Sequence, residues 1–253
     1  MKKSDFYCKE DMISIIDENN YKKNNEILDF VFGGAETYVH SSIVLEKDII
    51  ELCVLQEREI REIFSTGENE VELIVVNGKV LNKYLSETGI YARTFFVEKN
   101  LKVFIIFDNN LKLLRRLLTH EYVHCIRLKN LNIESDREYI RYFSNVNNWI
   151  IEEVFAVAAE KRICQIETWE EAIGFEFNPE WKLIRKKDLS FEKIAEKVQS
   201  KEIIEYVNSL KKYDFSVMYY IVYVISKKIE IDSQIEFLLG KSSKEIETYI
   251  TNI

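Results

Sequence analysis

The segment His120-Glu121-Tyr122-Val123-His124 places two histidines four residues apart, in a chain of 253 residues that holds only 3 histidines. At about 100° per residue, both imidazoles would lie on one face of a helix, one turn apart. Two imidazoles in this relation can bind one zinc ion. Glu121 flanks the same face, where a carboxylate can accept a proton from a metal-activated water molecule. The spacing predicts a zinc helix with His120 and His124 as ligands and Glu121 as general base.

The neighbours of this motif indicate a buried helix. They are mostly apolar: Leu117, Leu118, Tyr122, Val123 and Ile126. A surface helix with two unrelated histidines is the alternative, but it would not need so many apolar side chains. A buried helix, in turn, needs partners for its histidines and its glutamate, and a bound metal ion supplies one.

A catalytic zinc site also needs a third protein ligand. Asn130 and Arg127 stand where the extended metzincin motif has histidine and glycine, which excludes that class of site. His40 is the remaining histidine, and the sequence does not place it. The apolar segment around Glu152 and Glu153 is the more attractive source, because a facing helix could bring one carboxylate to the metal.

Two adjacent acids near the start of a helix also have a simpler explanation. On an exposed surface they compensate the helix dipole. Because adjacent side chains point about 100° apart, one of Glu152 and Glu153 could bind the metal while the other serves the dipole. The residues alone leave this choice open.

The elements that must position these groups follow from the periodicity of apolar residues. Residues 1–68 are expected to be mostly helical, with the best helix over Leu45–Phe64. The β signal is confined to residues 71–76, 91–97 and 101–107, and the last two are joined by a hairpin-sized connection. They predict a small antiparallel or mixed sheet.

The rest of the chain is expected to be helical. Asp108-Asn109-Asn110 and Asn147-Asn148 supply N-cap chemistry for helices over about 111–128 and 149–164. Further helices are expected at residues 191–199, 201–211, 217–228, 233–239 and 243–251. With only 7 glycines and 1 proline, the chain is predicted to be an α+β protein in which helix dominates.

Composition restricts the classes of partner and location. A formal net charge of -8 argues against nucleic acid, which needs a basic surface. The longest apolar run, Val217 to Ile225, is far short of the roughly 20 residues that cross a bilayer, and no secretory signal stands at the start. The four cysteines are widely spaced, as expected for free thiols. We therefore expect a cytoplasmic protein with no membrane partner.

The motifs together resemble the gluzincins, the HExxH…Glu zinc peptidases that include thermolysin and the aminopeptidase N group, and above all short bacterial predicted zinc-dependent proteases. Three segments carry the resemblance: Leu118–His124, Trp149–Glu152 and Tyr213–Ile225. The resemblance implies a zincin-like fold, with a small sheet packed on the HExxH helix and a helical C-terminal lobe. It also implies that residues 101–107 form the edge strand that lines a substrate cleft.

The resemblance further implies a zinc peptidase acting on a peptide or protein substrate. Zn²⁺ would be bound by His120, His124 and Glu152, with Glu121 as catalytic base and Tyr213 stabilising the oxyanion. The chain would comprise a helical region over 1–68, a catalytic core over 69–165 and a helical lobe over 166–253.

The chain departs from the family pattern at two positions. Glu153 replaces the usual glycine, and Ala156 replaces an acid that orients a histidine. These departures keep an inactive or regulatory zincin-fold module as an alternative. The Glu152-Glu153 pair also fits regulatory metallopeptidases that cleave repressors.

Overall fold

The computed structural model describes the fold of the central part of the chain and of shorter pieces on either side. The described residues are 21–23, 37–40, 55–56, 58–60, 62, 72–77, 92–97, 99–107, 110–168, 171, 222–223, 225–227, 241–242, 244–246 and 248. The chain divides into two compact units, residues 2–141 and residues 142–253 with Met1.

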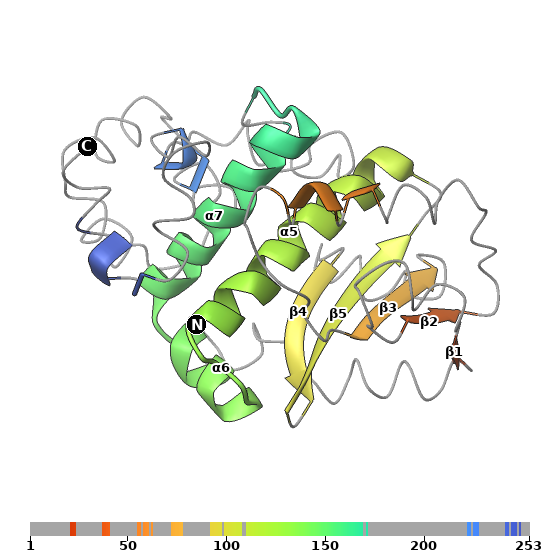
Figure 1. Ribbon diagram of the computed structural model, residues 1–253, viewed down its shortest axis with the longest axis horizontal. Helices are drawn as coiled ribbons and strands as arrows, with labels where there is room; N and C mark the ends of the chain where they lie inside the picture. The colour runs from red at the N-terminus through yellow and green to blue at the C-terminus, as the bar shows by residue number, and fades with distance from the viewer. Residues whose placement is uncertain are drawn as a thin grey trace, which may run out of the picture. The chain divides into compact units, whose positions relative to one another are not determined.

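The first unit contains a five-stranded mixed sheet (Figure 1). Its strands are β1 (Tyr21–Lys23), β2 (Thr37–His40), β3 (Glu72–Asn77), β4 (Ala92–Val97) and β5 (Asn100–Phe107). They are ordered β1-β2-β3-β5-β4. β2, β3 and β5 are parallel to their neighbours within that set, whereas β1 and β4 pair antiparallel at the two ends.

The three predicted strands are confirmed, and β4 and β5 form the predicted hairpin. β1 and β2 were not predicted, because three and four residues are too few to show an alternating pattern. The expectation that residues 101–107 form an edge strand is wrong. β5 pairs with β4 on one side and β3 on the other, so the hairpin makes β4 the edge strand.

Helix α5 (Leu111–Asn130) confirms the predicted zinc helix in extent and in its N-cap. The Asn110 side chain accepts a hydrogen bond from the backbone N–H of Leu113 at 3.0 Å, which satisfies a donor that a helix start leaves open. Beyond the C-terminal end of the helix, the backbone N–H of Ile133 donates a hydrogen bond to the Leu128 carbonyl. Asn132 adopts a φ of 54° there, a conformation that asparagine tolerates better than most residues.

Helix α5 packs on the sheet against β4 and β5 (Figure 1). Val103 and Ile105 of β5 are fully buried, as are Tyr122 and Val123 of α5. The apolar face of α5 therefore packs against the apolar face of the sheet in one core. This burial was predicted from the apolar residues around the motif.

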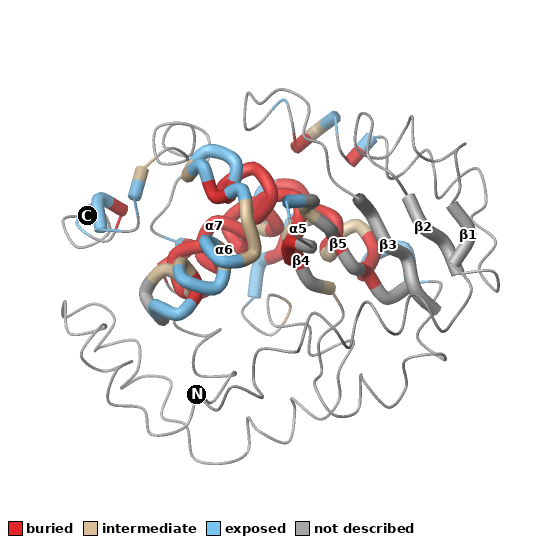
Figure 2. Tube along the Cα trace, turned by 90° about the horizontal axis from the view of Figure 1, so that it is seen from below, coloured by how far each residue is buried: buried red, intermediate tan, exposed pale blue. Residues whose placement is uncertain are grey.

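Helix α6 (Asp136–Phe143) was not predicted. It is short and mostly exposed, as its pale blue turns in Figure 2 show. Ser135 stands at its start, and its hydroxyl exchanges hydrogen bonds with Glu138. This capping box is a signal for a helix start that the periodicity did not reveal.

Helix α7 (Val146–Cys164), in the second unit, confirms the helix predicted over 149–164 but begins three residues earlier. The predicted N-cap role of Asn147-Asn148 is therefore wrong. Asn148 lies inside the helix, and its side-chain amide donates to the backbone carbonyl of Tyr142. Most described residues of α7 are buried (Figure 2).

The expectation that helix dominates is confirmed for the described part of the chain. Pieces of three other predicted helices are described as helical, at residues 55–62, 222–226 and 244–248. The helices predicted at 191–199, 201–211 and 233–239 lie outside the described residues. The predicted domain boundaries at residues 68 and 165 stay a prediction.

Candidate metal centre

The two histidines of the motif lie together on α5, as their spacing predicted. Their ring centroids are 4.8 Å apart and the rings meet edge to face at 79°. His120 is half-buried and His124 is buried. The helix therefore presents two imidazoles side by side at a largely desolvated position.

The carboxylate of Glu121 is buried and is held from the sheet. The Thr94 hydroxyl on β4 donates a hydrogen bond to Glu121 Oε2 at 2.7 Å, and the same hydroxyl lies 3.3 Å from the Glu121 backbone carbonyl. Thr94 and Glu121 are 3% and 5% exposed. A buried carboxylate needs such a donor, because losing its hydration without one costs free energy.

Thr94 is itself fixed by its surroundings. It pairs with Val103 across the β4–β5 hairpin. Its backbone carbonyl accepts a hydrogen bond from the Tyr139 hydroxyl at 2.8 Å, and the Tyr139 ring packs edge to face on Phe96. Sequence reasoning missed Thr94, although a polar residue beside Phe95 and Phe96 in an apolar strand is a signal that its hydroxyl has a partner.

Cys125, which follows His124, belongs to the same buried region. Its Sγ lies 3.9 Å from Thr94 Oγ1, and the residue is fully buried. Burial, and secondly the nearby Glu121 carboxylate, raise the pKa of the Cys125 thiol well above its ordinary value. The thiol therefore contacts Thr94 on the sheet side of α5.

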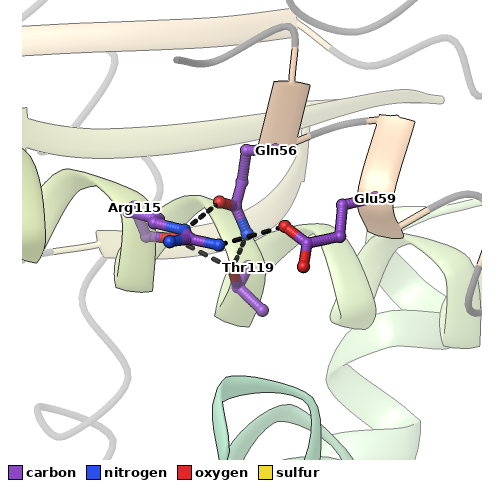
Figure 3. A network of polar contacts seen from close by, with 4 residues as sticks. All are labelled: Gln56, Glu59, Arg115 and Thr119. Carbon is purple, nitrogen blue, oxygen red and sulfur yellow. Dashed lines mark hydrogen bonds and ion pairs between the residues drawn. The ribbon is translucent and has the colours of Figure 1, made fainter. Parts of the chain in front are cut away.

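A polar network holds the start of the motif from another side (Figure 3). Gln56 Nε2 donates to Thr119 Oγ1 at 2.6 Å, and Arg115 Nε donates to Gln56 Oε1 at 2.6 Å. Arg115 also pairs with Glu59 at 3.0 Å. Gln56 and Thr119 are buried, so the helical segment around Gln56 is joined to α5 one residue before His120.

In the second unit, α7 carries the two candidate acids, and both are buried. Glu152 is 0% exposed and Glu153 6%. They lie beyond the first turn of the helix, which contains no acid. The explanation of these acids as surface residues that compensate the helix dipole is therefore wrong.

Glu152 has a defined hydrogen-bond donor within its own unit. The Tyr142 hydroxyl donates to Glu152 Oε1 at 2.7 Å. Tyr142 is held in turn, because the Asn148 amide donates to its carbonyl at 2.8 Å. Sequence reasoning missed Tyr142, since α6 had not been predicted.

His120 and His124 are the predicted ligands that the structure brings together within one unit. Glu152 and Glu153 belong to the other unit. The predicted oxyanion donor, Tyr213, lies outside the described residues. So do Tyr219 and Tyr220, and the side chain of His40.

Tyr223 from the same predicted tyrosine-bearing helix is described and has a role in packing. Its hydroxyl donates to the backbone carbonyl of Glu167. The ammonium groups of Lys227 and Lys161 lie 4.6 and 5.7 Å from the centre of its ring. Tyr223 is buried, so these contacts belong to a packed face of its unit.

Comparison of the chain with models of protein families, with curated proteins and with solved structures finds no match. The resemblance to the gluzincins therefore depends on the motifs quoted above. Among the described residues, no helix is both long and apolar enough to pass through a membrane.

Proposed function

We propose that this protein is a zinc-dependent metallohydrolase that hydrolyses peptide bonds. The observation that carries the proposal is the pair of imidazoles on α5, whose ring centroids are 4.8 Å apart, with the buried carboxylate of Glu121 between them in the sequence. The zincin-like fold belongs to the same proposal, and the packing of α5 on a mixed sheet supports it.

The chemistry of the donor set fits zinc. Two imidazole nitrogens and one carboxylate oxygen are the three-ligand set of many catalytic zinc sites, which leave one position open. When bound there, zinc supplies Lewis acidity that polarises a carbonyl oxygen and makes a water molecule easier to deprotonate.

We assign the third ligand to Glu153, where the resemblance pointed to Glu152. One observation supports this assignment: the Glu152 carboxylate accepts the Tyr142 hydroxyl through Oε1. Adjacent helix positions point about 100° apart, so one acid can bind the metal while the other is hydrogen-bonded to Tyr142.

Glu121 is the proposed general base. Its carboxylate stands beside His120 on α5, so it reaches the water position without joining the ligand set. It accepts the proton of the attacking water and returns it to the leaving amine of the cleaved peptide. Tyr213 stays the predicted donor to the oxyanion.

Metal content tests the ligand assignment. Zinc per chain is measured by elemental analysis for the wild type and for His120→Ala, Glu153→Gln and Glu152→Gln, each confirmed as folded by circular dichroism. We expect one zinc in the wild type, none in His120→Ala, and a roughly 10-fold to 100-fold weaker affinity in Glu153→Gln.

Glu152→Gln is the matched control, because an amide oxygen can still accept the Tyr142 hydroxyl. It should retain zinc. Unchanged zinc content in His120→Ala would refute the metal centre, whereas a loss in Glu152→Gln with full binding in Glu153→Gln would return the third ligand to Glu152.

A further inference from the structure

We propose that Thr94 is a positioning residue of this centre. Its hydroxyl holds the Glu121 carboxylate by Oε2, so that Glu121 acts as base and stays out of the metal's ligand set. This inference rests on the proposed function and deepens it, because it assigns a role to an edge-strand residue outside the HExxH motif.

The geometry of the Thr94 hydroxyl supports the assignment. A hydroxyl has one proton to donate, and the shorter of its two contacts on Glu121 is to Oε2, at 2.7 Å against 3.3 Å for the backbone carbonyl. Within the described part of the chain, this hydroxyl is the group that donates to the Glu121 carboxylate. It engages one of two oxygens, and the second is the one that can accept a proton.

The contacts of Thr94 make this hydrogen bond a constraint rather than a chance approach. Thr94 is held by its register with Val103, by the Tyr139 hydroxyl on its carbonyl and by burial. A donor held in this way restricts the carboxylate position to what one hydrogen bond allows. Preorganisation of this kind is what a catalytic group needs.

The need for a constraint follows from the position of Glu121 in the sequence. A carboxylate beside His120 on the same helix face is chemically able to bind the metal itself. The hydrogen bond from Thr94 on β4 instead holds this carboxylate toward the sheet.

Cobalt substitution tests the proposal without any substrate. The metal-free full chain is titrated with Co²⁺, whose visible absorption weakens when its coordination number rises above four. Thr94→Val removes the hydroxyl at nearly constant volume, and Thr94→Ser retains it. Thr94→Val combined with Glu121→Gln removes both the constraint and the carboxylate.

We expect the visible absorption per bound cobalt to fall by about twofold or more in Thr94→Val, because Glu121 joins the ligands. Thr94→Ser and the double variant should resemble the wild type. If Thr94→Val does not fold, as judged by circular dichroism, Thr94→Ala is used in its place.

Two results would overturn the role of Thr94 and leave the metal centre intact. One is a wild-type spectrum for a folded Thr94→Val. The other is an altered spectrum that persists in the double variant, because the change would then not pass through Glu121. Failure of the wild type to bind cobalt would instead overturn the proposed function, and this inference with it.

Discussion

At the scale of single residues, the centre is defined by buried charge. Glu121, Glu152 and Glu153 are each at most 6% exposed. Carboxylates are rarely buried to this degree unless they are paired. The Thr94 hydroxyl donates to Glu121, and the Tyr142 hydroxyl donates to Glu152.

The role of Glu121 leads to the first prediction at this scale. Glu121→Gln should retain zinc and lower the turnover of a confirmed peptide substrate by roughly 10²-fold to 10⁴-fold, because an amide cannot accept the proton. The amide oxygen can still accept the Thr94 hydroxyl, so the fold should be preserved. Zinc analysis and peptide cleavage measured on the same preparation check both parts.

The same variant separates an enzyme from a regulatory module of the same fold. Hydrolysis at the wild-type rate in Glu121→Gln would rule out this carboxylate as the base. Zinc binding in a wild type that cleaves no peptide from a diverse library would favour the binding module that the replacements at Glu153 and Ala156 left open.

At the scale of elements, α5 is positioned from several directions. Asn110 caps its start, β4 and β5 pack against it, and Gln56 joins it at Thr119. The hydrogen bond between Gln56 and Thr119 is buried. In the ion pair between Arg115 and Glu59, by contrast, each side chain is more than a third exposed. Their contributions to stability should differ accordingly.

Thr119→Val should lower the free energy of unfolding by about 1–3 kcal/mol, because it leaves the buried Gln56 amide without this acceptor. Glu59→Gln is the matched control from the same network, and it should cost less than about 1 kcal/mol because solvent screens the pair. Urea denaturation of both variants measures the difference. Equal losses of unfolding free energy in the two variants would show that burial does not determine how much these contacts stabilise the fold.

At the scale of the whole molecule, the proposed metal is a ligand of the folded chain. His120 and His124 lie side by side because α5 is formed. A metal that binds only the folded chain stabilises it through mass action. Removal of the metal should therefore weaken the entire fold.

Zinc should raise the thermal midpoint of unfolding, with about 4 kcal/mol of stabilisation at a free zinc concentration a thousand times the Kd. A chelator should reverse the effect. His120→Ala should respond to neither, and differential scanning calorimetry on both proteins tests this. A zinc response of equal size in His120→Ala would mean that the ion binds elsewhere.

The sequence by itself determined helix α5 and the shared face of its two histidines. The spacing of His120 and His124, the apolar residues around them and Asn110 at the N-cap are local features, and the helical repeat of 3.6 residues converts them directly into one face of α5. The hairpin of β4 and β5 was equally predictable, because two apolar runs joined by a short connection indicate that the two strands pair with each other.

Only the tertiary structure decided the surroundings of that helix. Sheet order depends on contacts between distant segments. The resemblance therefore implied an edge position for β5, whereas β4 is the strand that lies at that edge. Thr94 reaches Glu121 across 27 residues, and no local pattern encodes that distance. Likewise, the Tyr142 hydroxyl donates to Glu152, and adjacent acids of one type carry no sequence signal that shows which of them has this partner.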